Sequence, residues 1–219
     1  MATAAQVAEY RANNANLIIL VRNDMQAFWD ALNLNGSPLL VRDALLDFFP
    51  ELITAYGDTS AVLAADFYDQ TRGLQPSSTR FRALLSDTPD LEQSLASARW
   101  GLGALFTPEP DPALAFANLM GAAQRLVLQA GRTTTITSAS RDPVRTGFAR
   151  IPVGATCRFC TQIASRGFVF GSSISAGDSN SWHDDCDCVV VAANSKDARP
   201  EGYDPAEYLR LYTEGLGIS

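Results

Sequence analysis

Five side chains that can bind a metal ion lie close together near the end of this 219-residue chain. Cys157 and Cys160 form a Cys-x2-Cys pair, and after twenty-two intervening residues His183, Cys186 and Cys188 form a His-x2-Cys-x-Cys set. They are the only cysteines and the only histidine of the chain. A Cys-x2-Cys pair brings two thiolates to one ion from a tight turn or the first turn of a helix. Because thiolate and imidazole donors in tetrahedral number select zinc, we predict a structural zinc site with one donor to spare.

Two other interpretations of the same residues remain open. The four cysteines can form two disulfides that join the Cys157/Cys160 end to the Cys186/Cys188 end, although nothing in the sequence indicates an oxidising compartment. One histidine among cysteines can also activate a catalytic thiolate, but the sequence identifies no acid to orient it. The chain has no glycine-rich phosphate loop, Gly-x-Ser-x-Gly elbow or His-Glu-x-x-His motif, so we expect no enzyme.

The segment around these donors is predicted to be a small module rich in loops. Short β-like runs at 147–153, 168–170 and 188–192 are separated by Gly- and Ser-rich stretches. A short helix is expected after Cys160, and a last one at 205–213, where an aspartate cap is followed by proline. Three short strands bury little core, so metal ligation would supply part of the free energy of folding.

The first 140 residues are predicted to be helical. Helical apolar patterns cover 3–33, 37–50, 59–72, 90–106 and 112–130. Pro50 is expected to kink or end the second helix, and Gly131 to end the fifth. Beyond Gly131 the sequence becomes rich in Thr and Ser. This change in composition places a domain boundary within 131–143.

These patterns together predict the fold class. We expect a mainly α N-terminal domain, residues 1–140, and a small α+β Cys/His-rich C-terminal module, residues 141–219, which ends in the short helix.

An apolar stripe in the first helix is a candidate partner-binding surface. Leu17, Val21, Met25 and Phe28 follow one another at spacings of four, four and three residues, which places them on one face. Such a stripe more often packs on its own domain, whereas exposure would leave it for a partner protein. We therefore expect the stripe to be exposed if it is the docking surface.

Charge and hydropathy exclude some classes of function. The net charge is −7, and acidic residues outnumber basic ones in both predicted parts, which argues against tight binding to a phosphate backbone. Asp184, Asp185 and Asp187 alternate with the metal donors and are expected to form a solvated face, and Trp182 to form a packing lid over the site. The apolar runs are too short to span a bilayer, so we expect no membrane partner.

Several motifs of the C-terminal part resemble, in their order, the signature of MuF-like minor head proteins of tailed bacteriophages, most closely the actinobacteriophage branch. The resemblance covers roughly residues 144–193, and the motifs are Arg150-Ile151-Pro152, Thr156-Cys157-Arg158-Phe159-Cys160, Ile163-Ala164-Ser165-Arg166-Gly167 and Trp182-His183-Asp184-Asp185-Cys186-Asp187-Cys188. The first 140 residues are similar only in their helical character.

The resemblance implies a non-enzymatic minor capsid protein of the virion. Such a protein enters the procapsid in few copies in the host cytoplasm and lies inside the head near the portal vertex. There it supports head assembly, DNA packaging or ejection. The portal protein and the major capsid protein are the expected partners, and contact with packaged DNA is a further expectation. The alternative is a zinc-module protein that binds nucleic acid or regulates another protein.

Overall fold

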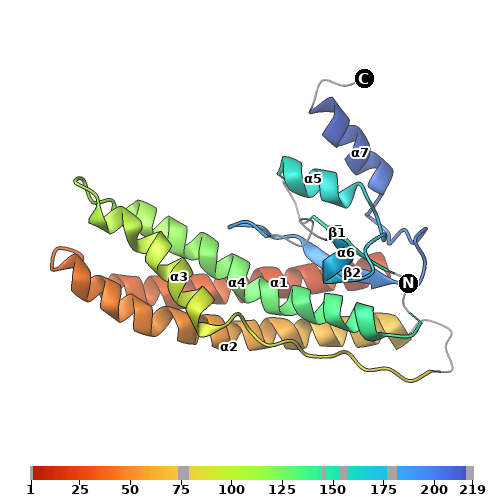
Figure 1. The fold of residues 1–219 in the computed structure, drawn as a ribbon, viewed down its shortest axis with the longest axis horizontal. Coiled ribbons are helices and arrows are strands. Elements are labelled where there is room, and N and C mark those ends of the chain that lie inside the picture. The colour runs from red at the N-terminus through yellow and green to blue at the C-terminus, as the bar shows by residue number, and fades with distance from the viewer. Residues whose placement is uncertain (1, 74–78, 145–146, 153–156, 177–181, 216–219) are drawn as a thin grey trace.

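A computed structural model describes residues 2–73, 79–144, 147–152, 157–176 and 182–215. Helices α1 (Ala4–Asp30), α2 (Pro38–Gly73) and α4 (Pro112–Arg141) lie side by side, and α3 (Leu91–Leu102) with a 3₁₀ turn (Gly103–Phe106) packs on them at one end (Figure 1). A small sheet with the short helices lies at the other end. The structure thus confirms the predicted fold class: mainly α, with a small α+β module near the C-terminus.

The apolar stripe of α1 faces the core. The helix begins at a capping box between Thr3 and Gln6, which satisfies backbone amides of its first turn. Leu17 is 4% exposed, and Val21 and Met25 are fully buried among residues of α2, α3 and α4. Phe28 is half-buried and stacks on Phe48, with ring centroids 3.9 Å apart. The expectation of an exposed docking stripe is therefore wrong, because the bundle itself covers it.

Helix α2 does not end at Pro50, the second of the two outcomes predicted for this proline. It runs through the proline and includes the segment predicted as a separate helix at 59–72. Proline removes one backbone hydrogen bond, but here Phe49, Pro50 and Ile53 are all buried against the bundle. Tertiary packing on both sides of the proline therefore keeps the helix continuous.

Helix α4 likewise extends beyond its predicted end, to Arg141. A Cβ on Gly131 would lie 2.6 Å from the Ser60 hydroxyl of α2, so this glycine permits a close approach of two helices and does not end one. The hydroxyls of Thr134 and Ser138 accept hydrogen bonds from the amides of Ser86 and Leu84. The Ser- and Thr-rich stretch is therefore a helical face that binds the extended segment after α2.

The module is built on two antiparallel strands. Strands β1 (Gly147–Ile151) and β2 (Val189–Ala193) pair from Gly147 opposite Ala193 to Ile151 opposite Val189. The predicted strand at 168–170 forms only a bridge between Phe148 and Phe170, and a short helix, α6 (Ser173–Ala176), follows it. The predicted end of the first β-like run, Val153, lies outside the described residues.

Helices α5 (Arg158–Ala164) and α7 (Pro205–Glu214) pack on one another, and α5 also contacts β1.

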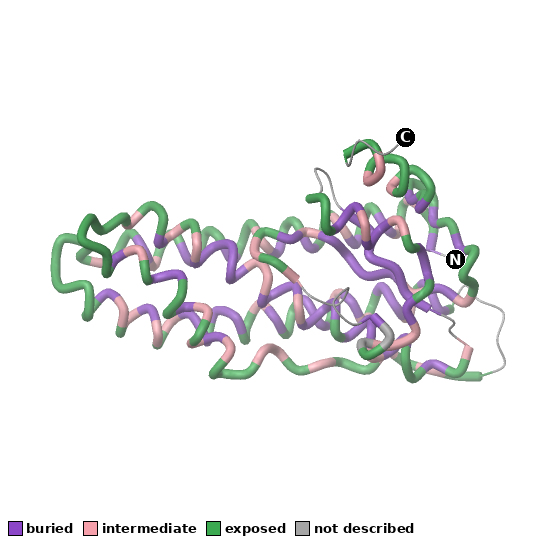
Figure 2. The backbone as a smooth tube through the Cα atoms, turned by 45° about the horizontal axis from the view of Figure 1, so that its top comes forward, coloured by how far each residue is buried: buried purple, intermediate pink, exposed green. Residues whose placement is uncertain are grey.

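A second buried cluster joins the module to the bundle. Tyr10 of α1 stacks on Phe67 of α2, with centroids 4.5 Å apart, and the same cluster contains Ile151, Phe168 and Val189 of the module. Figure 2 shows buried backbone continuing from the long helices into the strands. Among the described residues, no helix is both long enough and apolar enough to cross a membrane.

Candidate metal centre

The N-terminal turn of α5 positions the first two sulfurs. Cys157 is the N-cap residue, and its Sγ accepts a hydrogen bond from the amide of Cys160 at 3.3 Å. Because a cap side chain turns back over the first helical turn, both sulfurs lie on the same side of it. The predicted helical turn is therefore present, and the structure places Cys157 at the surface and Cys160 in the interior.

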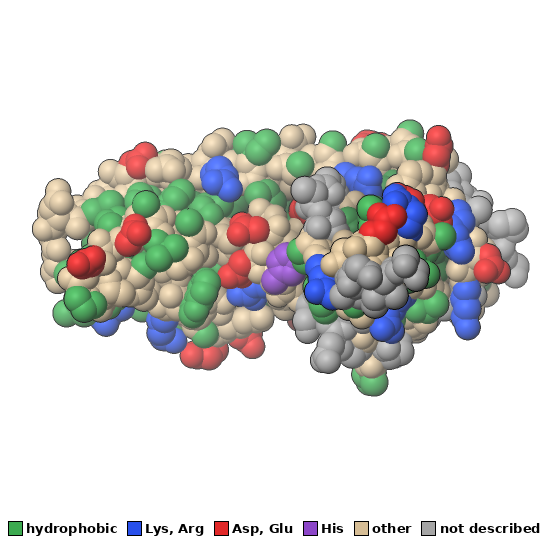
Figure 3. Space-filling model, turned by 90° about the horizontal axis from the view of Figure 1, so that it is seen from above, with side chains coloured by type: hydrophobic (Ala, Val, Ile, Leu, Met, Phe, Trp, Pro, Cys, Tyr) green, Lys and Arg blue, Asp and Glu red, His purple; other side chains and the backbone are tan. Residues whose placement is uncertain are grey.

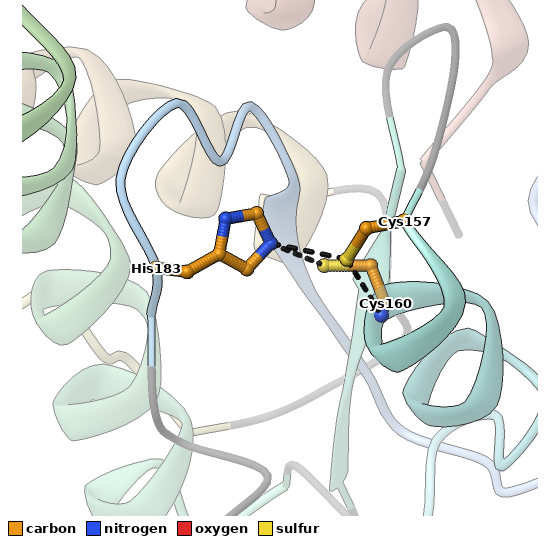
Figure 4. Close-up of side chains that lie close together, drawn as sticks. All are labelled: Cys157, Cys160 and His183. Atoms are coloured by element: carbon orange, nitrogen blue, oxygen red, sulfur yellow. Dashed lines mark hydrogen bonds between the residues drawn. The ribbon is translucent and has the colours of Figure 1, made fainter.

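His183 reaches these sulfurs from a loop on the opposite side (Figure 4). Its Nε2 lies 3.1 Å from the Sγ of Cys157 and 3.6 Å from that of Cys160. Its Nδ1 lies 2.7 Å from the carbonyl oxygen of Asp184. A carbonyl only accepts, so Nδ1 carries the proton and Nε2 presents its lone pair to the two sulfurs. Metal-binding histidines are commonly oriented in the same way, by a hydrogen-bond acceptor at the ring nitrogen that does not bind the metal.

Cys186 and Cys188 complete the cluster from the same loop. Both are 2% exposed, and the Sγ atoms of Cys160 and Cys186 are 3.8 Å apart. The five donors form two overlapping groups, Cys157–Cys160–His183 and Cys160–Cys186–Cys188, with the donor atoms of each group within 4.8 Å of one another. Cys160 belongs to both groups. The structure therefore brings together all five residues that the sequence singled out.

The donor separations suit a tetrahedral ion. With Zn–S bonds of about 2.3 Å and Zn–N bonds of about 2.05 Å, a tetrahedral centre has S···S edges of about 3.8 Å and S···N edges of about 3.6 Å. The Cys160–Cys186 and Cys160–His183 separations are 3.8 and 3.6 Å, and the Cys157–His183 separation, 3.1 Å, is somewhat shorter. All four cysteines are free thiols in this arrangement. Cys186 is grouped with neither Cys157 nor His183 within 4.8 Å, so one ion bound by all four donors requires the loop and α5 to move closer together.

The electrostatic environment shifts the pKa values of the donors in opposite directions. Hydrogen bonds from Cys160 and Cys188, together with the charge of Arg132, hold the pKa of the Cys186 thiol well below its usual value. Partial burial opposes ionisation of Cys157, but the hydrogen bond from the Cys160 amide and the interaction with His183 outweigh it and lower the pKa of that thiol. The carbonyl of Asp184 accepts the Nδ1 proton and raises the pKa of His183, which favours the protonated ring over the neutral form that binds a metal.

Hydrogen bonds to Cys186 and Cys188, with burial, raise the pKa of the Cys160 thiol. The hydrogen bond with Cys160 lowers the pKa of Cys188, but that with Cys186 and burial raise it to about 12. Cys157 and Cys186 therefore favour the thiolate before any cation binds, whereas ligation by Cys160 would release its proton.

The bundle holds the loop that carries His183 and the last two cysteines. Arg125 of α4 forms an ion pair with Asp184 at 2.7 Å, and the amide of Asp185 lies 3.5 Å from the carbonyl oxygen of Gly121. A Cβ on Gly121 would lie 3.0 Å from Asp184, so glycine allows the loop to approach α4. The expectation that Asp184 belongs to a solvated face is therefore wrong. Figure 3 shows the histidine at the surface between the helical end and the module.

Trp182 packs against the three buried cysteines, as predicted for a lid. Two arginines that the sequence patterns did not single out lie beneath this tryptophan. The guanidinium carbons of Arg132 of α4 and Arg150 of β1 lie 4.0 and 3.6 Å from the ring centroid. For Arg150 a signal was available, because it is the only charged residue in the run Gly147–Ile151.

The fold and the site together define a helical-bundle protein with a Cys/His centre docked on its longest helices. The family model of the VG15 protein matches residues 1–215. The chain belongs to this family, and its relatives are bacteriophage proteins.

Two of these relatives are similar over most of the chain. The Gene 15 protein of Mycobacterium phage L5 is 29% identical in an alignment of 187 residues, with 65% of this chain and 62% of that protein covered. The Gene 15 protein of Mycobacterium phage D29 is 30% identical in an alignment of 178 residues, with 65% of this chain and 63% of that protein covered. The aligned part thus spans less than two thirds of each relative. No solved structure matches the chain.

Proposed function

We propose that this chain is a structural, non-enzymatic minor head protein of a tailed bacteriophage. It works inside the head, near the portal vertex, and contacts the portal protein or the major capsid protein during assembly, DNA packaging or ejection. The observation that carries the proposal is membership of a phage protein family over residues 1–215. The ordered Cys/His motifs of the MuF-like signature support the more specific role, because they occupy a single built site.

A structural role for the Cys/His centre fits its donor set. We assign Cys157, Cys160, His183 and Cys186 as ligands of one zinc ion, with Cys188 beside them. A centre with four protein ligands leaves no position for substrate, whereas catalytic zinc keeps one open. A catalytic Cys–His pair would need one activated thiol, but here the imidazole is grouped with two sulfurs, and one of these belongs to a second group of three. Zinc would then join α5 to the loop before β2 and stabilise the module.

Sequence-specific DNA recognition has less support. The net charge is −7, and on the face in Figure 3 basic side chains lie among acidic ones and do not form a continuous stripe. Phosphate binding depends on clustered Lys and Arg. Contact with packaged DNA would therefore be incidental to an assembly role.

The experiment that tests the proposal is mass spectrometry of purified particles of a phage that encodes this chain. We expect the protein in proheads and in DNA-filled heads, at few copies per particle relative to the major capsid protein. Deletion of the gene should lower the yield of filled heads, and the wild-type gene supplied in trans should restore it. Presence in infected cells but absence from both particle types would refute the structural role and favour a regulatory one.

The metal claim has its own test. Protein purified without chelator should contain about one zinc per chain, and all four thiols should react once the protein is denatured without reductant. Four unreactive thiols and no metal would mean two disulfides, and would remove the zinc centre without affecting the virion proposal.

A further inference from the structure

Two buried arginines reach the Cys/His centre from different parts of the fold. Arg132 of α4 is 2% exposed and Arg150 of β1 is 1% exposed. Arg150 places its Nη2 at 3.5 Å from the sulfurs of both Cys160 and Cys186. Arg132 donates from Nε to the carbonyl of Cys188 at 3.1 Å and from Nη2 to that of Cys186 at 2.5 Å. One guanidinium therefore contacts the sulfurs, and the other holds the backbone that carries them.

Such burial is costly unless negative charge lies nearby. Removing a guanidinium from water costs several kcal/mol, even after relaxation, so buried charges are normally paired. Within the described part of the chain, no carboxylate forms an ion pair with Arg132, and its Nη1 has no hydrogen-bond partner. Burial lowers the pKa of Arg132, and negative charge on Cys186 and Cys188 opposes that effect. Thiolates of the centre would therefore supply the counter-charge that no described carboxylate gives Arg132.

A loaded centre would carry negative charge next to the two arginines. Zinc with three thiolates and a neutral imidazole carries one net negative charge. Arg150 reaches two of the ligand sulfurs, and Arg132 holds the backbone of the loop that carries Cys186. Their guanidinium groups would offset the charge of the centre in the interior, where unpaired charge is costly.

We propose that Arg132 and Arg150 are the counter-ions of the metal–thiolate centre, and that Arg132 also couples the centre to the helical bundle. This inference rests on the metal centre proposed above. Arg150 hydrogen-bonds two ligand sulfurs, which withdraws electron density from them. Arg132 anchors the ligand-bearing loop to α4 through two carbonyls. The metal affinity of the module consequently depends on a residue of the bundle as well as on its own ligands.

The test is the affinity for zinc of Arg132→Met and Arg150→Met, measured in the full chain by competition with a chromophoric chelator. Methionine keeps the length of the side chain and removes its charge. We expect each variant to lose about 10- to 100-fold in affinity, as is typical when a group that supports metal ligands is removed. Arg158→Met is the matched control, because Arg158 is exposed and follows a ligand directly in the sequence. It should bind zinc as the wild type does.

Two further readouts separate counter-ion action from general damage. In the cobalt-substituted protein, loss of the Arg150 hydrogen bonds should shift the thiolate-to-cobalt charge-transfer band to lower energy, because the sulfurs become more electron-rich. Arg132→Lys and Arg150→Lys keep the charge and should recover most of the affinity. If a methionine variant does not fold, as judged by loss of helical circular dichroism, the lysine variants and the cobalt spectrum still test the proposal.

The outcomes are distinguishable. Lowered zinc affinity in both methionine variants, recovery with lysine and an unchanged control would support the counter-ion role. A wild-type protein that binds zinc with an affinity that neither methionine change alters would overturn it and leave the metal centre intact. A wild-type protein that binds no metal would overturn the metal centre itself, and this proposal with it.

Discussion

Cys160 is the donor on which the whole centre depends, because it is the only one that belongs to both donor groups. We predict that Cys160→Ser lowers zinc affinity far more than Cys188→Ser. The two residues make a matched pair, since both sulfurs are buried to the same 2% exposure and both substitutions remove one thiol. Any difference in metal binding between the variants therefore reports ligation and not burial.

The size of the effect follows from the geometry. Apparent binding free energies of structural zinc in small modules are about 10–16 kcal/mol, so one of four ligands accounts for about 2.5–4 kcal/mol. At about 1.4 kcal/mol per tenfold change, loss of Cys160 should cost roughly 100- to 1,000-fold in affinity. Cys188 is not among the four assigned ligands, and its loss should cost no more than the 10- to 100-fold typical of a supporting residue.

Chelator competition with zinc would measure both affinities, and the cobalt-substituted protein would count the bound thiolates. Cys160→Ser should reduce the intensity of the charge-transfer band, whereas Cys188→Ser should leave three thiolates on the metal. Equal losses in the two variants would refute the ligand assignment. A larger loss for Cys188→Ser would mean that Cys188 takes the place assigned to Cys186 or His183.

Three further predictions concern the scaffold. Met25→Ala should lower the free energy of unfolding of the zinc-loaded protein in urea by about 2–5 kcal/mol, because Met25 is fully buried; a change near zero would mean that the stripe is exposed after all. Gly131→Ala should destabilise by about 1–3 kcal/mol despite the higher helix propensity of alanine, because its Cβ would meet Ser60 at 2.6 Å; stabilisation in the same assay would contradict the close helix contact. Burial raises the pKa of Tyr10 to about 12, and a pKa raised by folding contributes stability that is present below the unfolded value of about 10 and is lost as pH rises towards 12. Between pH 10 and 12 the wild type should therefore lose more unfolding free energy than Tyr10→Phe, and parallel profiles would refute the effect.

Much of the site could be predicted because its signals are local. The Cys-x2-Cys spacing places two sulfurs on one helical turn whatever surrounds it, and the structure shows that turn at the start of α5. Asp204 and Pro205 similarly predict the start of α7, where the aspartate caps the helix. The fold class followed from apolar periodicity, which is also a local property of the chain.

The errors arose where packing overrides local preference. Pro50 and Gly131 are helix breakers by propensity, yet both lie inside long helices because neighbouring side chains bury the first and a close helix contact requires the second. The stripe of Leu17, Val21 and Met25 has the same spacing whether it faces a core or a partner. Only the positions of α2, α3 and α4 decide that it is buried.

The sequence by itself determined the five donors, the turn that holds two of them and the helical character of the chain, because each depends on residue type and short spacing. The tertiary structure decided how the donors meet. The contact between His183 and Cys157 joins residues 26 positions apart, and the two arginines at the centre come from α4 and β1. No short spacing encodes such proximity, since it results from the docking of a loop and a strand on the bundle.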